Sequence, residues 1–176
     1  MPFERTGEET VHEGKIFSVK RLALRFDDGE ETEREIVVHP GAVAVVPFDG
    51  DRIYMVAQPR EAVDEQALLE LPAGKLDEEG EGPEETAKRE LAEEIGKGAR
   101  EWRKLTSFYT SPGFAAEECH VYLATGLYDK RAETEENERI EIVEIPIDRL
   151  DATIEDCRDA KSLVGLLWFK AYVNAA

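Results

Sequence analysis

Apolar and polar side chains alternate over several short stretches of the chain, which is the pattern of half-buried β-strands. Residues 14–26 (GKIFSVKRLALRF) follow this alternation, and the DDGEE that comes after them is typical of a hairpin turn. A return strand is expected over residues 33–39 (EREIVVH). The first forty residues are therefore predicted to contain a β-hairpin.

Two further strands are predicted from almost continuous apolar runs. These are residues 41–48 (GAVAVVPF) and 52–58 (RIYMVAQ), joined by the turn sequence DGD. Strands that are apolar on both faces suit a sheet that is covered on both sides. Residues 107–113 and 119–127 bracket another turn, and residues 140–147 (IEIVEIPI) are expected to form a last strand.

A helix is predicted over residues 83–95 (PEETAKRELAEEI). Pro83 suits the first helical position, where a missing N–H does no harm. At 100° per residue, Ala87, Leu91 and Ile95 form one apolar stripe that is expected to pack inward.

Two late segments, residues 148–157 and 159–173, are also predicted to be helical, the second with Asp159 as its N-cap. One stripe of that second helix is expected to comprise Leu163, Leu166, Leu167 and Lys170.

The mixture of strands and helices predicts an α/β fold. A boundary is expected near the His-Pro-Gly at residues 39–41. Residues 1–40 are then a small N-terminal β extension, and residues 41–176 form the α/β body. The extension offers too little core to stand alone, so it is expected to pack against a body.

Composition narrows the functional classes. The net charge of −18 argues against nucleic-acid binding, which needs a basic surface, but it allows a phosphate substrate if metal ions supply positive charge. The two cysteines, far apart and without CxxC spacing, favour a reducing compartment. No apolar run reaches membrane-spanning length and the first residues lack a signal-peptide core, so we expect a cytoplasmic protein without a membrane partner.

The helix at residues 83–95 carries an unusual crowd of carboxylates. Glu90, Glu93 and Glu94 lie almost on top of one another beside the apolar stripe, and Arg89 is placed one turn before Glu93, where it can orient it. Hard oxygen ligands in such a cluster are what Mg²⁺ or Mn²⁺ requires. The alternative is an exposed acidic helix whose charges pair with Lys88 and Arg89.

The order of residues around this helix resembles the Nudix box, which reads G, five residues, E, seven residues, R-E-U-x-E-E-x-G-U, with U apolar. The matching positions here are Gly74, Glu81, Arg89, Glu90, Leu91, Glu93, Glu94 and Gly96. Six residues rather than five separate Gly74 from Glu81, and Lys97 stands where an apolar residue is usual.

The resemblance covers most of the chain. HPGAVAVVPF, AQPREAV, ELPAGKLDEEGE, SPGF and DAKSLVGLL look like the ADP-ribose pyrophosphatase branch of the Nudix hydrolases. The resemblance implies an α/β/α sandwich with a small N-terminal β extension that helps to form a homodimer. It also implies metal-dependent hydrolysis of ADP-ribose to AMP and ribose 5-phosphate.

The resemblance and the negative charge of a diphosphate together predict which residues bind the metal and which acts as the base. A diphosphate resists attack by water until Mg²⁺ or Mn²⁺ neutralises it. Glu90, Glu93 and Glu94 are assigned as ligands, and the resemblance adds the Ala73 carbonyl. The general base is expected in the acidic loop before the last strand, where Glu138 is the first choice and Glu136 the next.

Five residues are candidates for contacts with the substrate. Arg60, at the end of AQPR, suits a phosphate fork, or a surface ion pair. Arg34 is a further basic candidate on the extension, and Phe17 could stack on adenine or belong to the core. Glu70 could accept from the adenine amine or simply lie at a strand end, and Glu117, after SPGF, could bind ribose hydroxyls or a metal.

Three functions remain open from sequence. The first is hydrolysis of ADP-ribose. The second is hydrolysis of another nucleoside diphosphate sugar, such as a GDP-sugar, at the same metal site. The third is a non-catalytic ADP-ribose sensor, which the intact box carboxylates and the acidic composition disfavour.

Overall fold

The computed structural model describes residues 2–130, 132 and 139–175. The chain divides into two compact units. The first comprises residues 1–41 and 109–118, and the second comprises residues 42–108 and 119–176. The sequence predicts an extension of residues 1–40 and a body of residues 41–176 that includes residues 109–118; that division into domains stays a prediction.

The first unit is a four-stranded sheet with the order β1-β2-β3-β9. Its strands are β1 (Phe3–Glu13), β2 (Ser18–Phe26), β3 (Glu31–Val38) and β9 (Ala115–Ala116). The predicted hairpin is confirmed: β2 and β3 pair antiparallel, and the Phe26 N–H donates to the Glu30 carbonyl at 2.9 Å across the turn.

Strand β1 was not predicted from the sequence. All eleven of its residues are exposed, so no buried face imposes an apolar alternation on them. Ion pairs with β2 take the place of a core, since Lys20 pairs with Glu8 at 2.5 Å and Arg21 with Glu9 at 3.1 Å. Such cross-strand charge pairs contribute to strand register.

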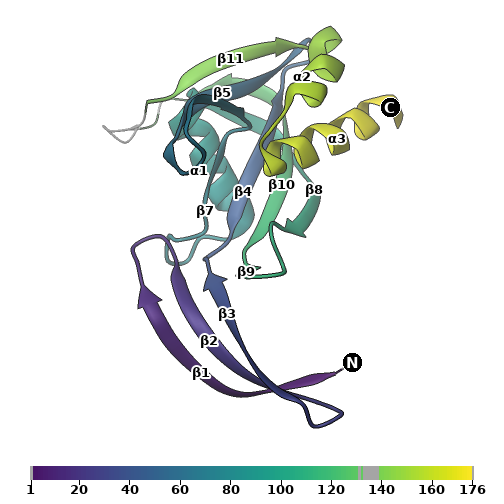
Figure 1. The fold of residues 1–176 in the computed structure, drawn as a ribbon. Helices are drawn as coiled ribbons and strands as arrows, with labels where there is room; N and C mark the ends of the chain where they lie inside the picture. The colour runs from purple at the N-terminus through teal and green to yellow at the C-terminus, as the bar shows by residue number, and fades with distance from the viewer. Residues whose placement is uncertain (1, 131, 133–138, 176) are drawn as a thin grey trace. The chain divides into compact units, whose positions relative to one another are not determined.

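The second unit is built on a seven-stranded mixed sheet with the path β11-β5-β4-β10-β8, to which β6 adds beside β5 and β7 beside β4 (Figure 1). The strands are β4 (Ala42–Phe48), β5 (Arg52–Arg60), β6 (Glu65–Glu70), β7 (Ala73–Lys75), β8 (Lys97–Tyr109), β10 (Glu118–Asp129) and β11 (Glu141–Pro146). The helices are α1 (Pro83–Ile95), α2 (Leu150–Asp156) and α3 (Ala160–Ala175), with short 3₁₀ turns η1 (Glu61–Val63) and η2 (Ile147–Arg149).

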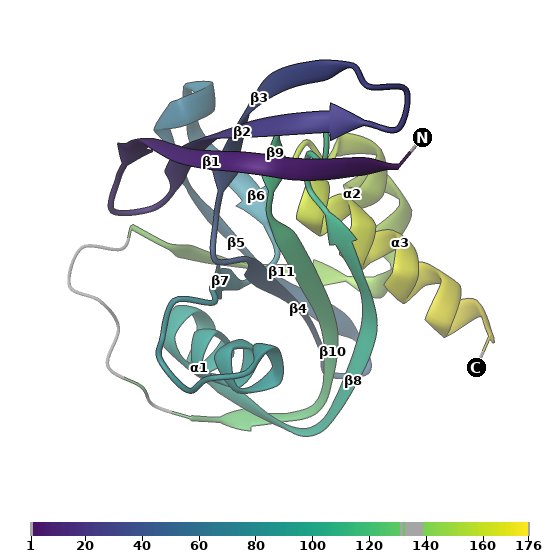
Figure 2. The ribbon, with the colours of Figure 1, turned by 90° about the horizontal axis from the view of Figure 1, so that it is seen from below.

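Helices cover both faces of this sheet, with α1 on one side and α2 and α3 on the other (Figures 1 and 2). Strand β4 explains the two cores. Val43 and Val45 pack into the cluster that contains the apolar stripe of α1, whereas Ala44 and Val46 pack into the cluster that contains Leu166. The predicted α/β/α sandwich is therefore confirmed. Strand β4 is apolar along its whole length because both of its faces are buried.

Helix α1 begins and ends where the sequence predicts. It starts at Pro83 and ends before Gly96, whose φ of 66° lies in the left-handed region that favours glycine. Ala87 and Leu91 are fully buried and Ile95 is 5% exposed, so the inward stripe is confirmed. The outer edge of this rigid element carries the carboxylates.

Helix α3 has its expected N-cap but a different buried face. The Asp159 carboxylate accepts from the Ser162 N–H at 3.0 Å, as an N-cap does. Leu166 and Phe169 are fully buried, whereas Leu167 is 48% exposed, so the predicted stripe through Leu167 is wrong. The buried face instead includes Phe169, whose ring packs against Phe48 with the centroids 5.0 Å apart. Among the described residues, no helix has the length and apolarity to cross a bilayer.

Candidate active site

Arg89 lies at the centre of the carboxylate cluster on α1. Its Nη1 donates to Glu90 Oε1 and to Glu93 Oε2, both at 2.8 Å, and its Nε donates to Glu81 Oε2 at 3.1 Å. Burial alone would lower the pKa of Arg89, but the charge of Glu90 and the hydrogen bonds to Glu81 and Glu93 raise it well above its ordinary value. The guanidinium is therefore always charged and fixes three carboxylates.

Glu81 joins this cluster despite the extra residue in the preceding loop. The loop absorbs that residue in a turn, where the Glu81 N–H donates to the Glu78 carbonyl at 3.3 Å and Gly80 has a φ of 88°. The Glu81 carboxylate also accepts from the Thr86 hydroxyl at 3.2 Å. The insertion thus leaves the contact between Glu81 and Arg89 intact.

Strand β7 forms the wall that faces α1. A Cβ atom at Gly74 would come within 1.9 Å of the Glu90 carboxyl carbon, so only glycine leaves room for this side chain. The neighbouring Ala73 N–H donates to Glu94 Oε2 at 3.0 Å, and Glu94 is only 8% exposed. Two of the three predicted ligands are therefore set against the backbone of residues 73 and 74.

The donor set fits a hard divalent cation. Glu90 and Glu93 each accept from Nη1 of Arg89, so their carboxylates already converge on one positively charged group. Carboxylate oxygens are the ligands that Mg²⁺ and Mn²⁺ prefer. Within residues 2–130, 132 and 139–175, no three acidic, histidine or cysteine side chains already stand in a closed ligating arrangement. The ligand set, including the Ala73 carbonyl, stays a prediction.

A second charged group surrounds the buried Glu70 carboxylate. Arg60 Nε donates to Glu70 Oε1 at 2.6 Å, Arg60 Nη2 donates to Oε2 at 2.7 Å, and Lys161 also donates to Oε2. Glu70 is 1% exposed and is the last residue of β6, and both of its oxygens accept from cations. The contact with the adenine amine stays a prediction.

Three candidate substrate contacts lie in the first unit. Phe17, at the turn between β1 and β2, is 43% exposed, so it is not the core residue of the alternative reading. Arg34 donates to the Thr32 hydroxyl at 2.6 Å and to the Glu33 carbonyl at 2.9 Å.

Glu117 is held by two neighbours of the same unit. Its Oε2 accepts from the Thr110 hydroxyl at 2.7 Å, and its Oε1 lies 3.4 Å from His39 Nδ1. Both proposed bases, Glu138 and Glu136, lie outside the described residues.

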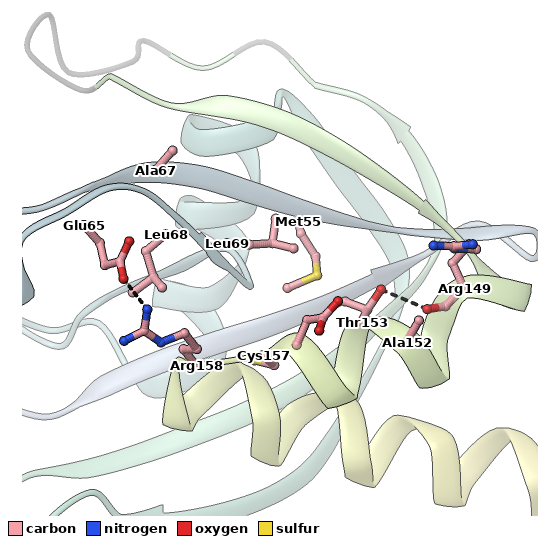
Figure 3. Close-up of a pocket in the computed structure, with 11 residues that line it drawn as sticks. Met55, Glu65, Ala67, Leu68, Leu69, Arg149, Ala152, Thr153, Cys157 and Arg158 are labelled. Carbon is pink, nitrogen blue, oxygen red and sulfur yellow. Dashed lines mark hydrogen bonds and ion pairs between the residues drawn. The ribbon is translucent and has the colours of Figure 1, made fainter.

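A cavity of about 310 Å³ lies elsewhere in the second unit, between β6 and α2 (Figure 3). Met55 and Leu69 contribute apolar lining, and an ion pair between Arg158 and Glu65 lies at one end. Neither the carboxylate cluster nor the Arg60 group lines this cavity. The cluster on α1 is therefore the better candidate for the active site.

The arrangement of glycine, arginine and glutamates on α1 agrees with the comparison with known families. The NUDIX domain model matches residues 38–163. This chain belongs to the NUDIX family, and it is a Nudix hydrolase. The match includes β4, the whole of α1 and the first residues of α3.

Relatives of this Nudix chain match it over almost its full length. An ADP-ribose pyrophosphatase of Bacillus subtilis (strain 168) is 42% identical over 173 residues, covering 93% of this chain and 92% of that protein. A methanol dehydrogenase activator of Bacillus methanolicus is 40% identical with the same coverage. A crystal structure of an ADP compounds hydrolase superposes with a TM-score of 0.89 at 24% identity, covering 99% of this chain and 96% of that one, which supports the fold.

Sequence reasoning missed one residue of the charged group around Glu70. Lys161 was not singled out, although it is only 17% exposed and contacts the buried Glu70. A signal existed, because Lys161 follows the N-cap of an otherwise apolar helix. In the structure this lysine is largely buried, and Glu70 is the anion that pairs with it.

Proposed function

We propose that this Nudix hydrolase cleaves the diphosphate of ADP-ribose to give AMP and ribose 5-phosphate, with Mg²⁺ or Mn²⁺ held by Glu90, Glu93 and Glu94. The observation that carries the proposal is the intact carboxylate cluster around Arg89, in a chain that matches an ADP-ribose pyrophosphatase over nearly its whole length.

Each residue has a definite task in this reaction. When bound, the divalent ions supply positive charge against the diphosphate and activate the attacking water. Arg89 keeps Glu90 and Glu93 oriented, and the Ala73 N–H keeps Glu94 in place. Water adds to one phosphorus, the bridging P–O bond breaks, and the proton of the water passes to a base, for which Glu138 is our first choice and Glu136 our second.

The ends of the substrate need contacts of their own. We assign Arg60 to the phosphates: its Nε and Nη2 donate to Glu70, and its Nη1 group is proposed to donate to phosphate oxygens. Phe17 is proposed to stack on adenine and Glu117 to bind the ribose hydroxyls, with Arg34 as a further basic contact. Phe17 is exposed, which supports a contact with a ligand. Arg34 and Glu117 are each held by a hydrogen bond to a threonine hydroxyl of the first unit, which would keep their side chains oriented.

A homodimer in the cytoplasm is the setting that we propose for this reaction. Large apolar side chains of the first unit are exposed in the single chain, namely Phe3, Val11, Ile16, Phe17 and Phe114. Such exposed apolar groups mark protein contacts. Cys119 and Cys157 are both free thiols, in accord with a reducing compartment.

A substrate panel tests the proposed function. With Mg²⁺ present, we expect kcat/KM for ADP-ribose to exceed that for GDP-mannose at least about tenfold, which corresponds to about 1.4 kcal/mol of transition-state binding. Glu117→Ala should reduce this preference without abolishing hydrolysis. A wild-type enzyme that prefers GDP-mannose would assign the chain to another nucleoside diphosphate sugar.

A further inference from the structure

Glu70 is a buried carboxylate on which two cations converge. It is 1% exposed, with Arg60 bonded to both of its oxygens and Lys161 bonded to Oε2. A buried charge is costly unless it is paired and hydrogen-bonded, and removing one partner leaves the other charges uncompensated. The two cations therefore share one anion, and the position of each depends on the other.

Lys161 is itself fixed from the side of α3. Its ammonium donates to Asp159 Oδ2 at 2.9 Å, and the same carboxylate accepts from the Ser162 N–H and hydroxyl at 3.0 and 2.6 Å. Ser162 Oγ in turn accepts from the Leu71 N–H at 2.7 Å. The first turn of α3 is thus bonded to the backbone immediately after Glu70.

The same short segment reaches the carboxylate cluster. Residues 70–74 hold Arg60 through Glu70, hold Glu94 through the Ala73 N–H, and leave room for Glu90 at Gly74. The hydrogen bonds that Arg60 donates to Glu70 are the main cause that raises the pKa of Arg60, and the charge of Glu94 contributes as well. Arg60 is therefore bonded to the same short segment that contacts Glu94 and Glu90.

We propose that Lys161, held by Asp159, is a positioning residue that fixes Glu70 and, through it, the Arg60 guanidinium as an anchor for the substrate diphosphate. This inference rests on the proposed function, because it takes Arg60 as the phosphate contact. The inference gives the N-terminus of α3 a part in substrate binding, in addition to the packing of this helix against the sheet.

The charges explain why Arg60 needs Lys161. Because Arg60 Nη2 and Lys161 both donate to Oε2 of Glu70, the negative charge of the carboxylate is shared between two cations and only partly neutralises Arg60. Without Lys161, Glu70 loses one of the two cations that fix it, so the carboxylate and the Arg60 guanidinium bonded to it no longer keep one position, and the contact of Arg60 with phosphate oxygens weakens. Since this contact exists in both ground and transition states, its loss should raise KM more than it lowers kcat.

Steady-state kinetics on ADP-ribose test the inference. We expect Lys161→Met to raise KM about tenfold with kcat within about threefold of wild type, and Lys161→Arg to restore KM to near the wild-type value. Lys170→Met is the matched control, since Lys170 lies on the same helix and pairs with Asp151 at 2.8 Å on the surface. Its KM should not change.

A double-mutant cycle separates positioning from a general structural effect. If Lys161 acts through Arg60, Lys161→Met should add no further increase in KM to an Arg60→Ala enzyme. Additive effects on KM, or an unchanged KM in Lys161→Met, would overturn the inference while leaving hydrolysis of ADP-ribose established. A wild-type enzyme that does not hydrolyse ADP-ribose would instead overturn the proposed function.

A second readout needs no turnover. In ¹H–¹⁵N spectra of the arginine Nε–H groups, the Arg60 signal, identified by its loss in Arg60→Ala, should exchange slowly with water in the wild type and in Lys170→Met. It should exchange faster in Lys161→Met, because the Glu70 carboxylate is no longer held. Equal exchange in all three proteins would contradict the positioning role, whatever the activity.

Discussion

At Gly74 the absence of a side chain decides where the Glu90 carboxylate can lie. A Cβ atom there would stand 1.9 Å from both the carboxyl carbon and Oε1 of Glu90. In Gly74→Ala the flexible Glu90 side chain can swing away at little cost in stability, but it then leaves the cluster. We expect kcat/KM to fall at least about tenfold, or about 1.4 kcal/mol of transition-state stabilisation, with the melting temperature nearly unchanged.

Gly82→Ala is the control for this change. Gly82 lies at the other end of the segment between β7 and α1, its φ of −89° is open to alanine, and a Cβ atom there meets nothing within 4 Å. If Gly74→Ala is as active as Gly82→Ala, the position of Glu90 does not matter for the reaction.

The choice of base is also a matter of single residues. If Glu138 accepts the proton of the attacking water, Glu138→Gln should lower kcat at least about 100-fold and change KM little, because a neutral amide cannot take a proton. Glu136→Gln should then be nearly normal. The opposite ranking of the two variants would show that our choice within the loop is wrong.

At the scale of elements, residues 70–74 connect α1, β5 and α3. The buried Glu70 carboxylate should make the stability of the folded protein depend on pH. Burial alone would raise the pKa of Glu70, but the hydrogen bond from Arg60 and the charge of Lys161 outweigh burial and lower it. A carboxyl group with a lowered folded-state pKa adds stability above its unfolded pKa of about 4.3, and this stability is lost as the pH falls through the folded-state pKa.

Urea unfolding between pH 6 and pH 3 measures this effect. We expect the free energy of unfolding to fall more steeply with acid in the wild type than in Glu70→Gln, whose amide cannot take up a proton. Near pH 6 the variant should already be less stable by about 2 kcal/mol, because two cations lose their anion. Identical slopes for the two proteins would mean that the Glu70 pKa is not shifted by folding.

Elements with one strong periodicity could be predicted from sequence, and those without it could not. Pro83 and Gly96 delimit α1, and its apolar stripe fixes its buried face. Strand β1 was missed because none of its residues is buried. The buried face of α3 was misassigned because apolar side chains lie on most sides of that helix, so the pattern does not single out one face. In the site, the spacing on α1 located the carboxylates, but only the tertiary fold brings Lys161 to Glu70, 91 residues away.

At the scale of the whole molecule, the first unit has little core of its own. Its exposed apolar side chains include Phe3, Ile16 and Phe114. If these contacts are completed by a second copy of the chain, a protein that starts at Gly41 should be monomeric or insoluble and should bind ADP-ribose more weakly.

Sedimentation at several protein concentrations measures the assembly. The full-length chain should sediment as a dimer, with activity that falls as dilution dissociates it. A full-length protein that is monomeric and fully active at low concentration would contradict the proposed homodimer.

The most direct measurement is the analysis of products by ³¹P NMR, with ADP-ribose and Mg²⁺, for the wild type and Glu94→Gln. We expect the wild type to convert the diphosphate signals into those of AMP and ribose 5-phosphate in equal amounts. The variant should stay folded but be slower by at least about 100-fold, because a neutral amide is a poor ligand for a hard cation. Near-normal turnover by Glu94→Gln at saturating Mg²⁺, or products other than these two monophosphates, would contradict the proposed active site.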